Sequence, residues 1–204
     1  MTRSQDETSE ALLAAAHRLL ATNGPESLTV RRIATEAGMS TMNVYSRFGG
    51  KDGVIDELYA DGYRRLVDAL DAVPTTDDIA GDLIRVAHAY RDFARDNPTY
   101  YGIMFRGTVH GFSPSAESTE LALSGLSALV ERVRFGQDRG VIVSGQDGDT
   151  TDVAALLWAT CHGLVSLELD GVGDEYVSWS KAFEHGIHTM IDALCPQGAD
   201  APRR

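Results

Sequence analysis

Apolar side chains recur every three or four residues along most of the chain, between breaks at glycine, proline and asparagine. This spacing is typical of amphipathic helices, whereas strands would show alternating apolar and polar positions. The sequence therefore predicts an all-α fold of about nine helices without a sheet. The expected helices cover residues 5–22, 30–38, 41–48, 52–73, 77–97, 99–106, 121–135, 153–169 and 176–194.

The first three helices fit within about fifty residues and predict a small, self-contained unit. Thr29 and Ser40 are residue types that cap helix N-termini, and each precedes a short amphipathic segment. Gly38 and the pair Gly49-Gly50 are expected to end these two short helices. We place the boundary of an N-terminal domain at residue 51.

The rest of the chain, residues 52–197, predicts a larger helical domain, followed by a tail at 198–204 that we expect to be disordered. Residues 153–169 are apolar on nearly every face, which predicts a helix buried on all sides by its own core or by a partner subunit. The last helix shows a single apolar stripe. Its members are Tyr176, Trp179, Phe183, Ile187, Met190, Ile191 and Leu194.

The net charge of −12 argues at first against a nucleic-acid partner, because phosphate binding needs a local excess of lysine and arginine. However, residues 1–51 carry six basic and five acidic groups, and residues 52–204 carry 12 basic and 25 acidic groups. The surplus negative charge thus lies outside the N-terminal segment, which remains able to meet DNA.

Membrane and redox signals are weak. The longest apolar stretch, 153–169, contains Thr160, His162, Ser166 and Glu168, and the N-terminus opens on polar residues. The two cysteines, Cys161 and Cys195, are far apart and form no metal-binding spacing. We expect a soluble cytoplasmic protein with no membrane partner.

Residues 28–48 carry the most informative motif, LTVRRIATEAGMSTMNVYSRF. A helix-turn-helix needs a small residue at the helix crossing, a turn residue that tolerates positive φ, and apolar residues that set the crossing angle. Ala34 and Gly38 meet the first two needs. Ile33, Met39, Val44 and Phe48 meet the third. The second helix of such a motif lies in the major groove.

This segment, followed by Lys51 and Val54, resembles the DNA-binding domain of the tetracycline-repressor (TetR) family. The family pattern has a threonine, a basic residue, Ile-Ala, Ala-Gly, then Leu/Val-Tyr-x-x-Phe and a lysine. A weaker resemblance joins residues 158–169, with Trp158, His162 and Gly163, to a Trp-His-Gly signature in the regulatory domain of one branch of that family. This chain departs from the commonest pattern at Asn43 and at Gly49-Gly50.

The resemblance implies roles for individual residues. The candidates for base contact are Arg31, Thr41, Met42 and Asn43. The candidates for phosphate contact are Thr29, Ser40, Tyr45, Arg47 and Lys51. An Asn side chain pairs bidentately with adenine and an Arg with guanine, whereas Met42 offers apolar contact. For Tyr45 and Phe48 the alternative is packing between the short helices, and for Arg31 and Arg47 it is a solvated face.

The resemblance also implies a homodimer held by the last two long helices and a ligand cavity among the middle helices. The candidate lining residues are Tyr59, Tyr63, Tyr90, Tyr100, Tyr101, Met104, Phe105, Trp158 and His162. For each of them, ordinary core packing is the alternative.

Catalytic and metal chemistry find little support in the sequence. His185, His188 and Asp192 share neighbouring positions on one helix, but a solvated or dimer-facing polar stripe explains them better than a metal site. Cys161 and His162 make a poor dyad because adjacent helical residues point in different directions. We expect no enzyme activity, no cofactor and no metal.

The sequence thus favours a repressor that binds a palindromic operator as a homodimer and is released by a small-molecule effector. The alternatives are an activator or architectural DNA-binding protein without a ligand response, a helical enzyme, and a protein-interaction adaptor with a vestigial DNA-binding head.

Overall fold

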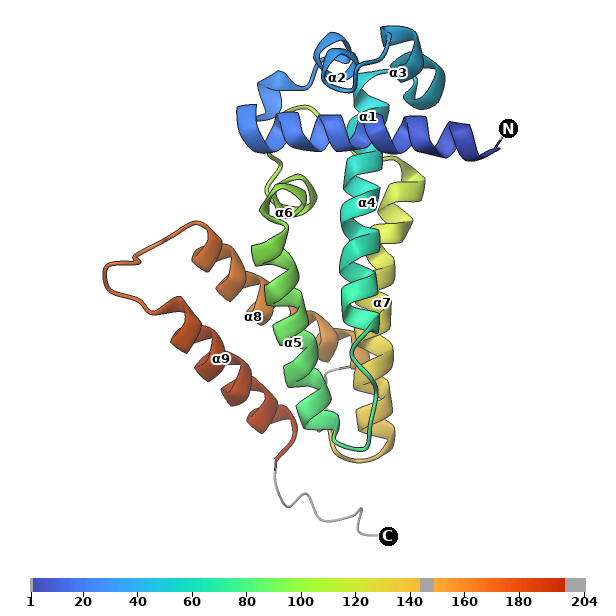
Figure 1. Ribbon diagram of the computed structural model, residues 1–204. Coiled ribbons are helices and arrows are strands. Elements are labelled where there is room, and N and C mark those ends of the chain that lie inside the picture. Colours follow the sequence, from blue (N-terminus) through green and yellow to red (C-terminus); the bar gives the residue numbers. More distant parts are fainter. Residues whose placement is uncertain (1, 144–148, 197–204) are drawn as a thin grey trace. The chain divides into compact units, whose positions relative to one another are not determined.

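The computed structural model describes residues 2–143 and 149–196 of the 204-residue chain. These residues form nine α-helices and one short 3₁₀ helix, without a β-strand among them (Figure 1). The helices are α1 Thr2–Asn23, α2 Val30–Glu36, α3 Thr41–Phe48, α4 Lys51–Asp71, α5 Ile79–Asp96, α6 Pro98–Phe105, α7 Ala116–Asp138, α8 Thr150–Leu169 and α9 Trp179–Leu194, with the 3₁₀ helix η1 at Pro25–Ser27. The predicted all-α fold is confirmed for this part of the chain.

The chain divides into two compact units. The first unit comprises Met1–Arg64 and Asn97–Ala122, and the second comprises Arg65–Asp96 and Leu123–Arg204. α4 and α7 contribute to both units, so compactness does not separate the chain at residue 51. A functional boundary at that residue stays a prediction. The expected tail at 198–204 lies outside the described residues.

The first unit is built around α1, which contacts α2, α3 and α6. Figure 1 shows α2 and α3 together on one side of α1. The inward face of α1 follows the three-to-four-residue spacing of an amphipathic helix. Its buried side chains are Leu12, Ala15, Ala16, Leu19 and Leu20. The buried hydroxyl of Ser27 shares its proton between the carbonyl oxygens of Leu19 and Gly24, at 2.9 and 2.6 Å, and so ties η1 to the end of α1.

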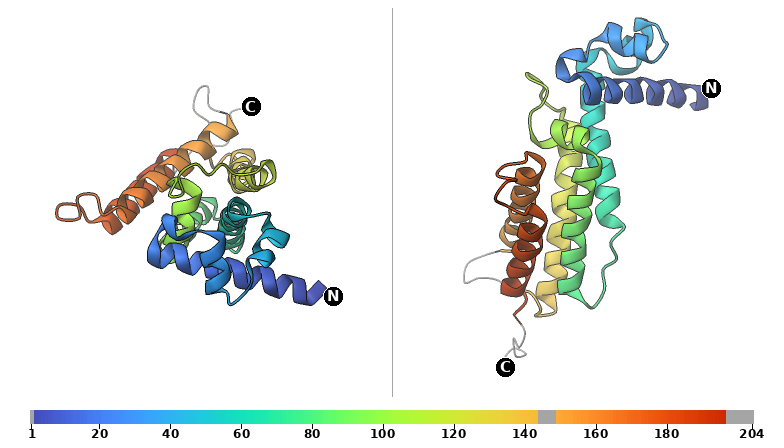
Figure 2. Two further views of the ribbon diagram at one scale, coloured as in Figure 1. Left: turned by 90° about the horizontal axis from the view of Figure 1, so that it is seen from above. Right: turned by 60° about the vertical axis from the view of Figure 1, so that its left-hand side comes forward.

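The second unit is formed by α5, α8 and α9, which contact one another in pairs, together with the C-terminal part of α7 and the end of α4. Both views in Figure 2 show α8 and α9 side by side. At Gly186 a Cβ atom would lie 2.9 Å from a methyl group of Leu164, so the absence of a side chain lets α9 approach α8. The backbone N–H of Val143 also donates to the carbonyl of Leu194, at 2.8 Å.

The sequence predicts that α8 is buried on all sides, either by the core of its own chain or by a partner subunit. The first of these two possibilities is wrong, because the single chain does not bury α8 on all sides. It buries a single stripe, formed by Val153, Ala154, Leu157, Cys161 and Val165. The side chains on the other faces remain accessible because α5 and α9 cover only part of the helix. Leu156 is 50% exposed, Leu167 41% and Trp158 38%.

By length and composition, α8 is also the one helix among the described residues that is able to cross a membrane. Packing of its buried stripe against α5 and α9 accounts for the apolar residues on one face. An apolar helix of this kind in a helical core does not indicate a membrane protein.

Two local expectations are corrected. Tyr176 does not belong to the stripe of the last helix: it precedes α9 and is 89% exposed, and α9 begins at Trp179, whose Nε1 donates to the carbonyl of Val172 at 2.9 Å. Ser40 occupies the N-cap position of α3 with extended backbone, but its side chain makes no capping hydrogen bond.

The helix α7 ends at Asp138, within the segment 136–140 whose glycines predict the close of this helix. A Cβ atom at Gly136 would collide with Ile142, so this glycine also serves close packing.

Candidate nucleic-acid interface

The turn between α2 and α3 is set by a cap at each end of α2. The Oγ1 atom of Thr29 accepts a hydrogen bond from the N–H of Arg32 at 3.2 Å, which confirms Thr29 as the N-cap. At the other end, the N–H of Met39 donates to Ala34 and the N–H of Gly38 to Thr35, at 2.8 and 3.1 Å. This pair of bonds is a Schellman motif, which needs a left-handed residue. Gly38, with φ of +68°, provides it.

The helix α3 presents most of its surface to solvent. Val44 is its one buried residue and packs the helix onto the unit. Met42 is 71% exposed and Tyr45 56% exposed, and Thr41 and Ser46 are exposed beside them. Asn43 is half-buried. The structure therefore places the candidate base-contact residues of α3 on or beside an open helix face.

The other predicted DNA contacts lie at the edges of this face or on α2. Thr29, Arg31, Ser40 and Lys51 are all exposed. Lys51 lies 3.9 Å from Asp52 in an exposed ion pair, an interaction that contributes little in water. Such a pair leaves the ammonium group available to a phosphate.

Arg47 differs from the other basic candidates because its side chain is half-buried. Its Nε atom is buried and has no hydrogen-bond partner among the described residues.

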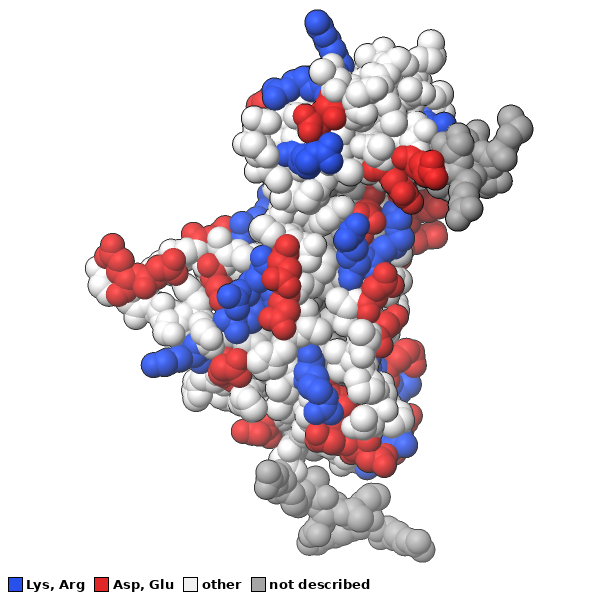
Figure 3. Space-filling view, in the orientation of Figure 1, with Lys and Arg blue, Asp and Glu red and all other residues white. Residues whose placement is uncertain are grey.

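On the face drawn in Figure 3, lysine and arginine side chains are interspersed with acidic ones, without a large patch of one sign. Local placement of basic groups, rather than a broad positive surface, distinguishes this site.

One residue that positions α3 was missed from the sequence. A Cβ atom at Gly53, in the first turn of α4, would lie 1.8 Å from the carbonyl oxygen of Phe48, the last residue of α3. The two helices thus meet backbone to backbone, and only glycine fits. A glycine inside a helical pattern, next to the two turn glycines Gly49 and Gly50, was the available signal.

The predicted pocket residues fall into two groups, one in each unit. In the first unit, the ring of Tyr63 lies 4.9 Å from that of Tyr59 and 5.6 Å from that of Phe105, and the rings of Tyr101 and Phe105 are 4.9 Å apart. Burial raises the pKa of the Tyr63 hydroxyl well above its usual value, so this group stays neutral.

Two further residues of the pocket set also pack within the first unit. Met104 is buried and lies against Gly62, where a Cβ atom would come within 2.7 Å of its sulfur. The hydroxyl of Tyr100 donates to the carboxylate of Asp61, at 2.5 Å. This part-buried hydrogen bond ties α6 to α4 beside the aromatic cluster.

In the second unit, Tyr90, Trp158 and His162 lie together. The hydroxyl of Tyr90 is hydrogen bonded to Nδ1 of His162, at 2.8 Å, and the rings of Trp158 and His162 are 5.9 Å apart. Burial raises the pKa of the neighbouring Cys161 thiol to about 12, which keeps it protonated and unreactive. Whether either group lines a cavity stays a prediction.

His185, His188 and Asp192 are exposed on α9, and His188 lies 4.0 Å from Glu184. Within residues 2–143 and 149–196, no group of three or more His, Cys, Asp or Glu side chains is arranged to hold a metal ion.

A solvent-facing second helix of a helix-turn-helix, carried by an all-helical chain, defines a DNA-binding transcriptional regulator. Two family models match the chain: "Bacterial regulatory proteins, tetR family" over residues 12–58, and "Tetracyclin repressor-like, C-terminal domain" over residues 83–194. The chain belongs to the TetR family, whose members are transcriptional regulators and not enzymes. The resemblance seen in residues 28–54 is thereby confirmed.

Individual relatives agree with this assignment. The HTH-type transcriptional regulator Rv1816 of Mycobacterium tuberculosis is 27% identical over 180 residues, which cover 76% of this chain and 77% of the relative. A protein of unknown function from Rhodococcus sp. RHA1 has a similar structure, with a TM-score of 0.80 and 25% identity over 92% of this chain and 95% of the other. The TetR family transcriptional regulator PfmR from Thermus thermophilus shares the fold, with a TM-score of 0.67 and 19% identity over 88% and 96% of the two chains.

Proposed function

We propose that this regulator is a homodimeric repressor that binds a palindromic operator through α3 of each subunit and leaves it when a small-molecule effector binds. The exposed face of α3 is the observation that carries the proposal. A surface helix that keeps Met42 and Tyr45 largely open to solvent leaves apolar area uncovered, which a DNA groove is able to cover. In this proposal residues 1–51 form the DNA-binding part.

The contacts divide into those that read bases and those that set the position on DNA. Thr41, Met42 and Asn43 occupy the first turn of α3, which is the part of a recognition helix that reaches base edges. Arg31 reaches the groove from α2. Thr29, Ser40, Tyr45, Arg47 and Lys51 contact phosphates through hydroxyl groups and positive charge.

The dimer is proposed to form through α8 and α9. Leu156 and Leu167 share one flank of α8 by helical spacing and leave apolar side chains exposed there in the single chain. A two-fold symmetric contact covers the same patch on both subunits at once. Burial of α8 by a partner is the second of the two modes expected from its sequence, and it explains the apolar residues that the chain itself leaves open.

The effector response is proposed to act on the spacing of the two recognition helices. Half-sites of a palindrome lie about 34 to 36 Å apart, so both copies of α3 dock only at a matching separation. Effector binding at the aromatic residues of the middle helices shifts the population towards a different placement of α4. The protein then acts in the cytoplasm, where its DNA and its effector meet.

The test is selection of DNA by the purified full chain from a genomic fragment library at moderate salt. We expect enrichment of an inverted repeat whose half-sites are one helical turn apart, and in vitro transcription from a promoter that overlaps the repeat should fall when the protein is added. Selection of no preferred sequence would overturn the proposal. Increased transcription would identify an activator.

A further inference from the structure

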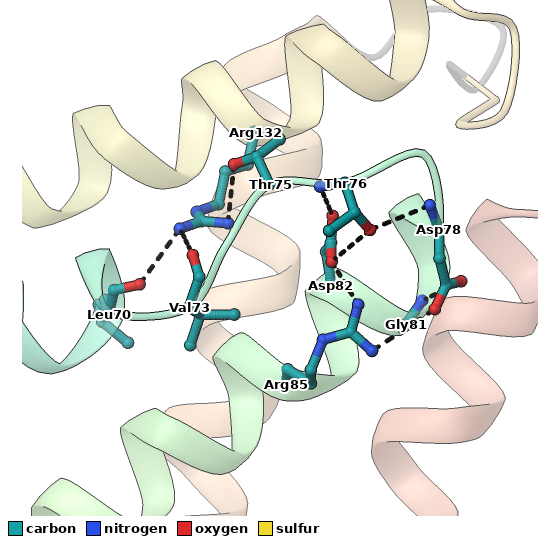
Figure 4. Close-up of polar contacts among 9 residues, drawn as sticks. All are labelled: Leu70, Val73, Thr75, Thr76, Asp78, Gly81, Asp82, Arg85 and Arg132. Atoms are coloured by element: carbon teal, nitrogen blue, oxygen red, sulfur yellow. Dashed lines mark hydrogen bonds and ion pairs between the residues drawn. The ribbon is translucent and has the colours of Figure 1, made fainter.

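The side chain of Arg132, on α7, holds the end of α4. Its Nη2 atom donates to the carbonyl oxygens of Leu70 and Val73, at 3.2 and 2.6 Å, and its Nη1 atom donates to Oγ1 of Thr75 at 3.1 Å (Figure 4). Leu70 lies in the last turn of α4, and Val73 and Thr75 lie in the linker that follows the helix. One guanidinium from a segment about sixty residues away thus binds the helix end and the linker at three oxygen atoms.

The linker that follows α4 is held from its other side by Asp82. This carboxylate, on α5, accepts hydrogen bonds from the backbone N–H of Thr76 at 2.5 Å and from its hydroxyl at 3.0 Å, and it pairs with Arg85. Figure 4 shows the linker between the two charged groups. Residues 70–76 are therefore bound at both ends by charge-assisted hydrogen bonds.

The other end of α4 is fixed to α3. Gly53, in the first turn of α4, permits a backbone contact with Phe48, the last residue of α3. A helix is stiff along its length, so a change at one end of α4 reaches the other. The C-terminal end is held by a side chain from a distant helix, that of Arg132 on α7.

We propose that Arg132 is a positioning residue for operator recognition: by binding the carbonyls at the end of α4, it sets the position of that helix and thereby the half-site spacing that the dimer accepts. The inference rests on the proposed function, since it needs a dimer that reads two half-sites. Arg132 touches no DNA in this scheme. It acts through α4. Its loss broadens the range of half-site spacings that the dimer binds and leaves the preference for particular bases unchanged.

The experiment compares operators with the selected half-site spacing to operators with one base pair inserted or removed at the centre. The wild-type protein, Arg132→Met, Arg132→Lys and the control Arg134→Met are titrated against each. Arg134 is a suitable control because it lies on the same helix and, in the part of the chain that the structure describes, forms an exposed pair with Glu131. We expect Arg132→Met to reduce the preference for the native spacing by about threefold or more, and Arg134→Met to keep it.

The spacing preference is a ratio of two affinities of the same protein sample. This ratio does not change when a fraction of the molecules is unfolded, so general destabilisation does not affect it. Arg132→Lys keeps the charge but lacks the planar fork, and we expect an intermediate preference. Hydrogen exchange of residues 66–73 gives a reading without DNA: it should speed up in Arg132→Met and stay unchanged in Arg134→Met.

An unchanged spacing preference with unchanged exchange would overturn the role of Arg132 while leaving the proposed function intact. Failure of the wild-type protein to select any site would instead overturn the proposed function, and the role of Arg132 in operator recognition with it.

Discussion

The guanidinium of Arg91, on α5, donates two hydrogen bonds of 2.7 Å to the carboxylate of Glu168, on α8, and its central carbon lies 4.7 Å from the ring centre of Phe183, on α9. One side chain thus joins the three helices of the second unit. Both charged groups are largely buried, with side-chain exposures of 7% and 17%. Loss of either partner leaves the other charge in a poorly solvated site.

Replacement of Arg91 by leucine is therefore expected to lower the free energy of unfolding by about 3 to 5 kcal/mol. Urea denaturation at a fixed protein concentration measures the change. Arg134→Leu removes an exposed arginine and should change stability by no more than about 0.5 kcal/mol. Equal, small losses for the two variants would show that the buried pair does not hold the unit together.

Acid should weaken the fold through Glu168 and Asp82. The hydrogen bonds from Arg91 hold the pKa of Glu168 below its usual value. For Asp82, burial opposes ionisation, but the bonds from Thr76 and Arg85 outweigh it and lower the pKa.

A carboxyl group whose pKa is lower in the folded state stabilises the fold at any pH above its unfolded pKa, about 4, and loses this contribution as the pH falls through the folded value. Stability should thus be level above about pH 5 and decline below it. Glu168→Gln should flatten the decline. A variant that keeps the full acid dependence would contradict the assignment.

Gly53→Ala is expected to abolish specific DNA binding while the second unit stays folded. The added methyl group meets the Phe48 carbonyl at 1.8 Å, so α3 and α4 must move apart. Overpacking of this kind costs about 1 to 3 kcal/mol. Electrophoretic mobility shift and circular dichroism measure the two effects.

The matched control for this change is Gly125→Ala, on α7. A Cβ atom there meets Val67 at an ordinary 3.7 Å, so the change should leave DNA binding intact and favour the helix slightly. If Gly53→Ala bound DNA with wild-type affinity, the close contact between α3 and α4 would not be needed for DNA binding.

Substitution of Asn43 and substitution of Lys51 should change DNA binding in different ways. Asn43→Ala should cost about 1 to 3 kcal/mol of operator affinity and relax the preference at one base pair, because an amide that reads a base is lost. Lys51→Ala should weaken all sequences alike and reduce the salt slope by about one, because a phosphate contact is lost. Binding to operator variants over a salt series separates the two patterns, and uniform losses from both would refute the division of contacts.

Leu156→Lys should convert the dimer to a monomer. Leu156 is 50% exposed on α8, and in the proposed dimer a charge at this position would enter an apolar interface without a compensating partner. Leu123→Lys is the control, since Leu123 is 57% exposed but belongs to α7. Sedimentation velocity over a range of concentrations should show a dimer for the control and a monomer for Leu156→Lys. The reverse order would place the interface on α7.

Local chemistry made the helices and the motif predictable. Periodic apolar positions located the nine helices of the described residues, and helix ends were predicted well where a single residue enforces them: Thr29 caps α2, and Gly38 and Gly49 adopt positive φ just after α2 and α3. Such signals act over a few residues, so they can be read without knowing the fold. The segment from Gly136 to Gly140 marks the end of α7, which falls at Asp138, but the close packing of Gly136 against Ile142 could not be read from the sequence.

Contacts between distant segments were decided only by the tertiary structure. Arg132 and Leu70 are 62 residues apart, and Arg91 and Glu168 are 77 apart. Nothing in their local patterns distinguishes these arginines from solvated ones, because a guanidinium finds its partner only after the helices have packed. The sequence by itself determined the helices, the helix-turn-helix and the family. The packing of those helices determined which charges are buried together, which face of α8 stays open, and why Gly53 cannot carry a side chain.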